Sequence, residues 1–297
     1  MAGTCRRNRR FAFAARLAVA ALFFAALLPA APSASPLTGH LLLNGGGGEA
    51  RGYWERFLAL AGGKDRPIVV LPTASERPEA GIEYVETLRE AGATNVQSIE
   101  LRTREDAGRA DFLSALSGAA GIFFTGGDQS RITAAILDTE AERAIRHVYD
   151  SGGVLGGSSA GLACMSAKML TGGGAPDRIA AGNTELARGL GFVTEAIVDQ
   201  HFVARQRQNR LLSVVLENPS LLGIGVDERT TVWIRPDRTL EVVGEGQVMI
   251  FDARASAARR VVTGDRTLLA IDALVSRILV AGDRLDLATG TLLRFAR

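Results

Sequence analysis

A serine between two glycines is the strongest chemical signal in this chain. The segment Gly157-Ser158-Ser159-Ala160-Gly161 has the G-x-S-x-G pattern of a nucleophile elbow, between a strand-like run, Val154–Gly157, and a helix-like run, Leu162–Met169. Glycines allow the sharp turn, and the following helix N-terminus favours developing negative charge. We therefore predict that Ser159 is a nucleophile. Ser158, which is not centred between the glycines, is the weaker candidate, and a serine that merely caps a helix is the alternative without chemistry.

A serine nucleophile needs a base within hydrogen-bond reach, and the chain has three histidines. His40 lies near the start of the first expected strand, and His147 lies near the end of a long expected helix. His201 directly follows the apolar strand Ala196–Val198, and the carboxyl ends of parallel strands hold the functional crevice in such folds. Position and elimination therefore favour His201 as the base.

A carboxylate is then expected to orient the imidazole and stabilise its charged form. If the order along the chain is serine, acid, histidine, the candidates lie between residues 159 and 201. Asp177, on the loop Gly174-Ala175-Pro176-Asp177, is the preferred acid, and Glu185 is the second choice. The residues alone leave this choice open.

Two further segments carry groups that suit a hydrolase. The turn Thr125-Gly126-Gly127-Asp128-Gln129 follows the strand-like run Gly121–Phe124, and one of its amides could form an oxyanion hole with the Ala160 amide. An ordinary turn with Asp128 as helix N-cap is the alternative. Downstream of His201, three arginines on an expected helix are placed to bind a carboxylate or to form a solvated face: Arg205, Arg207 and Arg210.

Alternating apolar runs and amphipathic stretches predict the fold class. Strand-length runs, which suit a buried parallel sheet, are His40–Leu43, Ile68–Leu71, Val96–Leu101, Gly121–Phe124, Val154–Gly157 and Ala196–Val198. Helix-length stretches between them are Arg51–Ala61, Glu79–Ala91, Asp106–Ser117 and Ser130–Ser151. We predict an α/β fold, a three-layer sandwich with a mostly parallel sheet.

From Gly223 onward, short apolar runs separated by turn residues, beginning with Ile224–Ile234, predict an antiparallel β-rich addition. No linker separates it, so residues 35–297 are expected to form a single domain in which 235–297 is a β-rich extension. Gly45–Gly48 follows a strand but lacks the G-x-G-x-x-G order of a dinucleotide site, so we interpret it as close backbone approach near the crevice.

Residues 1–34 have the pattern of an export signal. Arginines 6, 7, 9 and 10 precede the apolar run Leu17–Leu28, and small residues follow in Ala31-Pro32-Ser33-Ala34. The apolar run is short for a membrane-spanning helix, so we expect a cleaved signal, by the general or the twin-arginine route, and a periplasmic or extracellular protein without a stable membrane anchor.

The remaining composition excludes several classes of protein. The chain carries a net charge of +2, but the first 34 residues hold five arginines and no acid, so 34 − 5 = 29 basic residues face 32 acidic ones beyond them. This balance predicts no nucleic-acid partner. Cys5 lies in the signal and leaves Cys164 alone, and no Cys/His cluster has zinc spacing, so we expect neither a metal nor a cofactor. The oligomeric state, including a homodimer, stays open.

Taken together, the motifs around Gln129, Ser159, His201 and the three arginines, continued by Gly223-Ile224-Gly225-Val226-Asp227-Glu228, resemble cyanophycinases. These serine peptidases are grouped with aspartyl dipeptidases on the class I glutamine-amidotransferase-like fold, and the resemblance spans roughly His40 to Ile234. Two features depart from the family: Ser158 stands where threonine is common, and the family pattern favours glutamate as the acid rather than Asp177.

The resemblance implies roles for individual residues. Ser159 would be the nucleophile and His201 the base, with the amides of Gly127 or Asp128 and of Ala160 as oxyanion hole. The substrate pocket would be lined by Gln129, Asp199, Gln200, Arg205, Arg207 and Arg210. The family substrate is cyanophycin, a polyaspartate backbone with arginine on each β-carboxyl, which is cleaved to β-aspartyl-arginine. Alternatives are an α-aspartyl dipeptidase and a non-catalytic binding protein of the same fold.

Overall fold

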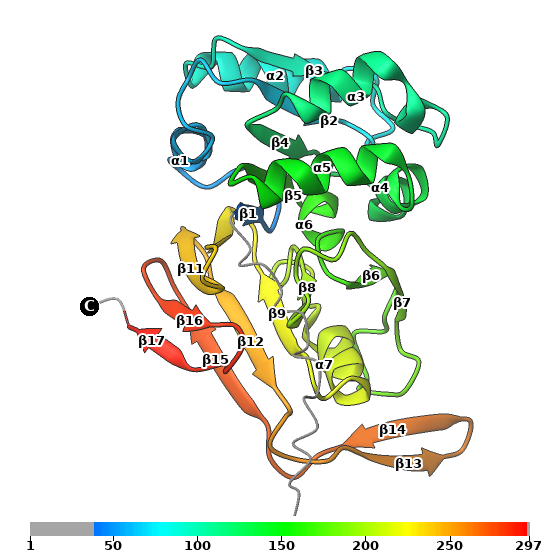
Figure 1. The fold of residues 1–297 in the computed structure, drawn as a ribbon. Coiled ribbons are helices and arrows are strands. Elements are labelled where there is room, and N and C mark those ends of the chain that lie inside the picture. The colour runs from blue at the N-terminus through cyan, green and yellow to red at the C-terminus, as the bar shows by residue number, and fades with distance from the viewer. Residues whose placement is uncertain (1–38, 296–297) are drawn as a thin grey trace, which may run out of the picture. The chain divides into compact units, whose positions relative to one another are not determined.

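The centre of the fold is a nine-stranded sheet, seen in a computed structural model that describes residues 39–295 (Figure 1). Its strands, in spatial order, are β17 (Leu292–Arg294), β16 (Arg284–Asp286), β11 (Thr239–Gly244), β10 (Thr230–Ile234), β1 (His40–Asn44), β5 (Val154–Ser158), β4 (Gly121–Phe124), β2 (Ile68–Leu71) and β3 (Val96–Ser98). The export signal predicted in residues 1–34 lies outside the described residues.

The sheet is mixed rather than mostly parallel. Pairings from β1 through β5, β4 and β2 to β3 are parallel, as the buried apolar runs predict. Those from β1 through β10, β11 and β16 to β17 are antiparallel, because hairpins from the C-terminal part of the chain extend the same sheet. Within residues 239–294, strands β11, β16 and β17 therefore belong to the central sheet, and the other strands belong to other β structure.

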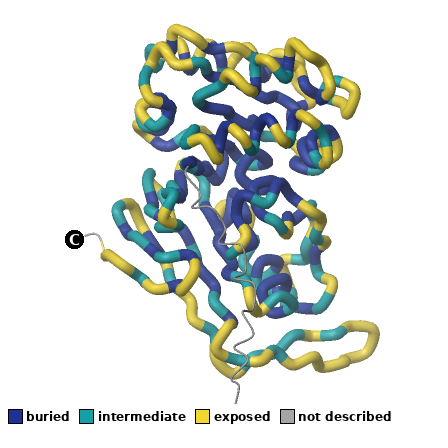
Figure 2. Tube along the Cα trace, in the orientation of Figure 1, coloured by how far each residue is buried: buried dark blue, intermediate teal, exposed yellow. Residues whose placement is uncertain are grey.

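Helices cover both faces of the parallel half and form a three-layer sandwich. The pleat sends alternate side chains to opposite faces. On β4, Phe123 packs with α1 (Tyr53–Leu60) and α2 (Ala80–Glu90), whereas Ile122 and Phe124 pack in the other core, with α3 (Ala110–Ser117), α4 (Gln129–Ile136) and α5 (Glu140–Asp150). All three strand residues are fully buried (Figure 2).

Three expected helices differ from the structure, the first being Asp106–Ser117, which is a 3₁₀ turn followed by α3. The stretch Ser130–Ser151 divides into α4 and α5, because Asp138 adopts a left-handed conformation at φ 61° and Thr139 caps the second helix by accepting from the Glu142 amide. The run after the elbow is only α6 (Ala160–Ala163), since the chain turns at once into strand β6 (Lys168–Gly172), paired with β7 (Glu185–Arg188).

A second sheet has four strands within the described residues, in the order β15 (Val275–Leu279), β12 (Val248–Asp252), β9 (Leu222–Val226) and β8 (Ala196–Asp199). Helix α7 (Gln208–Glu217) packs against it through Leu211, Val214 and Val215. A short 3₁₀ turn, Asp106–Gly108, precedes α3, and the hairpin β13 (Arg259–Thr263) with β14 (Arg266–Ala270) is mostly exposed (Figure 2). The run expected at Ile224–Ile234 is thus two strands in different sheets, joined by a turn at Asp227–Arg229.

Candidate active site

Ser159 lies on a strained turn between β5 and α6. Its backbone adopts φ 54° and ψ −104°, a conformation that L-residues rarely occupy and that functional sites often contain. The flanking glycines are sterically required, because a Cβ on Gly157 would lie 2.3 Å from the Gly161 carbonyl oxygen and one on Gly161 would lie 2.2 Å from the Phe124 carbonyl oxygen. The sequence pattern therefore marks a real elbow that presents one side chain, that of Ser159.

The imidazole of His201 links the serine to a carboxylate. Its Nε2 lies 2.9 Å from Ser159 Oγ, and its Nδ1 lies 2.7 Å from Glu228 Oε1. A carboxylate at Nδ1 favours the tautomer that carries its proton there, which leaves Nε2 free to accept the serine proton. The three side chains thus have the contacts of a serine-hydrolase triad.

Strand pairing explains why the base and the acid meet. Parallel strands β8 and β9 place Asp199 opposite Gly225, so the residues that leave the two strands at the same edge, His201 and Glu228, come together. The serine arrives from β5, in the other sheet. Turn residues between β9 and β10 therefore hold the acid where the two sheets adjoin.

The preferred acid, Asp177, is wrong. Asp177 is exposed on its loop and pairs with the neighbouring Arg178, with Oδ1 2.9 Å from Arg178 Nε, and Glu185 is an exposed residue of β7. The prediction assumed the order serine, acid, histidine along the chain, whereas the order here is serine, histidine, acid. The family preference for glutamate and the polar pair Asp227-Glu228 were the signals that could have found Glu228.

The Gly45–Gly48 segment packs directly on the histidine and the acid. A Cβ on Gly46 would lie 2.3 Å from His201 Cε1, and one on Gly47 would lie 2.7 Å from Glu228 Oε2. Both glycines have positive φ angles, and the Gly45 carbonyl accepts a 2.8 Å hydrogen bond from the His201 amide. These contacts confirm the interpretation of this segment as close backbone approach beside the crevice.

The site keeps His201 in its neutral, basic form. Burial lowers the pKa of His201 below the usual 6.5, and the charges of Arg205 and Arg207 act in the same direction, while the bond with Glu228 opposes them. The imidazole is therefore unprotonated at neutral pH and can accept a proton from Ser159.

The Gly126–Gly127 turn lies next to the nucleophile, as a Cβ built on Gly126 would be 3.5 Å from Ser159 Cβ. Gly127 has φ 140° and no room for a side chain against Ala74. The Asp128 amide is not available as an oxyanion donor, because it donates to the Ala74 carbonyl at 2.9 Å; its carboxylate caps α4 instead. Of the two candidate amides in this turn, the geometry leaves that of Gly127.

Several residues predicted to contact substrate are engaged with one another. Asp199 is buried and forms a bidentate ion pair with Arg210, with Oδ2 2.7 Å from Arg210 Nε. Its carboxylate is therefore not free to bind a substrate guanidinium. Arg207 donates to the Gln200 carbonyl at 2.7 Å and also contacts the Gln200 side chain. These contacts join the four side chains into one largely buried polar network beside His201 in the chain.

Two other predicted residues differ in availability. Gln129 is buried, and its Nε2 donates to the carbonyls of Leu170 and Thr171 at 2.7 and 2.9 Å, so its amide nitrogen anchors β6. Arg205, in contrast, is exposed and no hydrogen bond or ion pair holds its side chain among residues 39–295. A cavity of about 310 Å³ is lined by Arg205, Arg207 and Arg210 together with Gly173, Gly174, Pro176 and Gln206.

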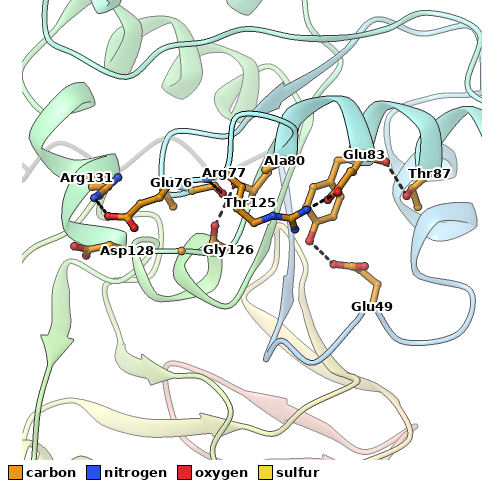
Figure 3. A pocket seen from close by; sticks show the side chains of 14 residues that line it. Glu49, Glu76, Arg77, Ala80, Glu83, Thr87, Thr125, Gly126, Asp128 and Arg131 are labelled. Atoms are coloured by element: carbon orange, nitrogen blue, oxygen red, sulfur yellow. Dashed lines mark hydrogen bonds and ion pairs between the residues drawn. The ribbon is translucent and has the colours of Figure 1, made fainter.

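A second, larger cavity of about 740 Å³ is lined by turn residues 125–128, by Arg131 of α4, by Glu49, and by residues of α2 and of the segment before it (Figure 3). Within residues 39–295, no cluster of histidine, cysteine and acidic side chains is arranged to hold a metal ion. In the same part of the chain, no helix combines the length and the apolar character needed to cross a bilayer.

Comparisons with known proteins show the family of this chain. The sequence profile described as peptidase family S51 matches residues 41–242. The chain belongs to peptidase family S51. It is 37% identical over 238 residues to a cyanophycinase of Geminocystis herdmanii, with 79% of this chain and 88% of the relative covered. It is also 36% identical to a cyanophycinase of Trichormus variabilis, covering 80% of each chain, and 39% identical to one of Synechococcus elongatus, covering 67% of this chain and 62% of the relative.

A solved structure supports the fold of this S51 peptidase. The crystal structure of a peptidase from an acI-B1 Actinobacterium superposes with a TM-score of 0.64 at 22% identity, covering 84% of this chain and 98% of the other. The α/β peptidase fold therefore holds for most of the chain.

The corrected acid gives a direct prediction. Glu228→Gln keeps the shape of the side chain but favours the wrong tautomer of His201, so kcat should fall by about 10⁴-fold in steady-state peptide hydrolysis. The matched control, Asp177→Asn, should stay within about twofold of the parent, as expected for a surface substitution. Loss of activity in the Asp177 variant, with activity retained in the Glu228 variant, would reverse the assignment.

The depressed pKa of His201 predicts the pH profile of kcat/KM. The base works only when neutral, so activity rises as pH rises through this pKa, and the midpoint of the acid limb should lie below pH 6.5. Arg205→Gln removes one positive charge that lowers the pKa and should move the limb to higher pH. A parent midpoint above 6.5, or no shift in the variant, contradicts the electrostatic account.

Proposed function

We propose that this chain is a serine peptidase that hydrolyses cyanophycin, or a related β-aspartyl peptide, to β-aspartyl-arginine dipeptides. The observation that carries the proposal is the hydrogen-bonded series Ser159–His201–Glu228 in a chain that is 37% identical to a cyanophycinase over 238 residues. A binding protein of the same fold would have no need for a strained serine in contact with a buried, neutral histidine.

In the proposed reaction, His201 Nε2 takes the proton of Ser159 as Oγ attacks the scissile carbonyl. Glu228 stabilises the resulting imidazolium through Nδ1. The proton then passes to the leaving amine, and an acyl-enzyme on Ser159 remains. Water, deprotonated by the same His201, attacks the ester and releases the second product, so no metal or cofactor takes part.

Two backbone amides are placed to stabilise the oxyanion of the tetrahedral intermediates. The Ala160 amide stands at the start of α6, directly after Ser159, and the Gly127 amide belongs to the turn beside the nucleophile. Preorganised amides of this kind contribute roughly 10²- to 10³-fold each to kcat. The cavity lined by the three arginines that follow His201 in the chain suits the carboxylates of an aspartyl substrate, with Arg205 as its exposed cation.

We further propose the class I glutamine-amidotransferase-like fold as the structural group of the sandwich, on the strength of its elbow between a central parallel strand and a helix. The exported location follows from residues 1–34, and a homodimer is a further option that sedimentation analysis can decide.

Export leads to a prediction about the mature protein. Expressed in a Gram-negative host, the full chain should appear outside the cytoplasm with its amino terminus near residue 35, found by amino-terminal sequencing. Substituting the basic residues that precede the apolar run, Arg6, Arg7, Arg9 and Arg10, with glutamine should retain the uncleaved chain in the cell. An uncleaved chain anchored in the membrane fraction would contradict the cleaved-signal proposal.

The substrate is tested by product analysis after incubation with purified cyanophycin. The parent protein should release β-aspartyl-arginine, whereas Ser159→Ala should release none above background, because Ser158, the other hydroxyl of the elbow, is buried and it is Ser159 Oγ that contacts His201 Nε2. A parallel assay with α-linked Asp-X dipeptides separates the alternative activity. Rapid cleavage of those dipeptides with no attack on cyanophycin would replace the proposal by an α-aspartyl dipeptidase.

A further inference from the structure

The larger cavity is lined by the Gly126–Gly127 turn, which also lies beside the nucleophile. The three arginines that follow His201 in the chain do not line it. Its volume of about 740 Å³ lies within the range of roughly 300 to 1,000 Å³ that small-molecule sites occupy. Figure 3 shows acidic and basic side chains along it, from Arg131 at one end to Glu83 and Glu49 at the other. None of the residues assigned to substrate by sequence, apart from the turn itself, lines this space.

The charges that line the cavity do not cancel. Both of its arginines are already neutralised by ion pairs, Arg77 with Glu83 at 2.5 Å and Arg131 with Glu76 (Figure 3). Two carboxylates remain, those of Glu49 and Asp128, and neither forms an ion pair with any of the residues 39–295. The cavity thus carries an excess of negative charge beside the nucleophile.

Glu49 is the more confined of the two carboxylates. It follows the Gly45–Gly48 segment, is partly buried, and accepts a 3.1 Å hydrogen bond from the Tyr84 hydroxyl on α2. Burial raises its pKa, and bonds from Tyr84 and from Ser158, the neighbour of the nucleophile, only partly oppose this. A carboxylate held by neutral donors, without a cation, gains most from a cationic ligand.

The arginine-lined cavity has the opposite sign. Arg205, Arg207 and Arg210 face only one buried carboxylate there, that of Asp199. One cavity is lined by arginines, two of which act electrostatically on the base, and is positive, and the other is lined by the oxyanion turn and is negative. A substrate that carries both a carboxylate and a distant cation is therefore oriented by the two fields, because the reversed orientation places like charges together.

We propose that Glu49 binds the guanidinium of a substrate arginine in this negative cavity and so determines specificity for arginine-bearing units. This inference rests on the proposed function, since it assigns the cationic part of the same substrate. Tyr84 is a positioning residue, which holds Glu49 Oε1 through the hydrogen bond from its hydroxyl. Glu49 acts on binding and takes no part in the chemistry of Ser159.

The test compares two synthetic β-linked aspartyl peptides, one with arginine side groups and one with citrulline, which has the same shape without the charge. The parent protein should prefer the arginine peptide through a lower KM. Glu49→Gln should remove this preference, raising KM for the arginine peptide by roughly tenfold to a hundredfold, the usual loss for a hydrogen bond to a charged group. Its kcat, and its KM for the citrulline peptide, should change little.

Glu86→Gln is the matched control, because Glu86 is exposed on the same helix as Tyr84 but does not line the cavity. It should keep the parent preference. If Glu49→Gln also keeps it while both peptides are cleaved, or if both variants lose it equally, the inference is overturned and the proposed function stands. If the parent cleaves neither peptide and not cyanophycin, the proposed function itself fails.

Discussion

The hydrogen bonds at the two nitrogens of His201 are the interaction on which the rest of the site depends. Among residues 39–295, no hydrogen bond joins Ser159 directly to Glu228, and the imidazole connects the two side chains through contacts of 2.9 and 2.7 Å. The ring keeps its place because the Gly45 carbonyl holds its backbone amide and because Gly46 leaves no space for the ring to move. Any side chain at Gly46 would displace the base, which explains glycine there in physical terms.

The fold solves a positioning problem with two sheets. The nine-stranded sheet supplies the elbow from β5, and the four-stranded sheet supplies the histidine and the acid from the ends of β8 and β9. The chain passes from β9 in one sheet to β10 in the other through the turn that carries Glu228. Because β10 pairs antiparallel with β1, hydrogen bonds connect the C-terminal half of the chain to the strand that leads into the Gly45–Gly48 segment. The β-rich part of the sequence thus helps to hold the site as well as to widen the sheet.

Sequence reasoning succeeded where a pattern has a single physical meaning. Strand-length apolar runs identified the parallel strands, and the spacing of Gly157, Ser159 and Gly161 identified the elbow, since few other residues fit such contacts. It failed where the answer depends on pairing between distant segments. Glu228 seemed to lie inside one long strand, and only the structure shows two strands that belong to different sheets, with the acid in the turn between them. Likewise, nothing in the sequence shows that Asp199 and Arg210 neutralise each other.

The central claim is that Ser159, activated by His201, is the nucleophile. Its most direct test is labelling of the intact protein with a serine-reactive phosphonate, followed by peptide mapping in a mass spectrometer. The account predicts one label, on Ser159, with loss of hydrolysis in proportion to labelling, and a much slower reaction in Glu228→Gln. A label on Ser158, or full hydrolysis by a protein whose Ser159 is completely labelled, would contradict it.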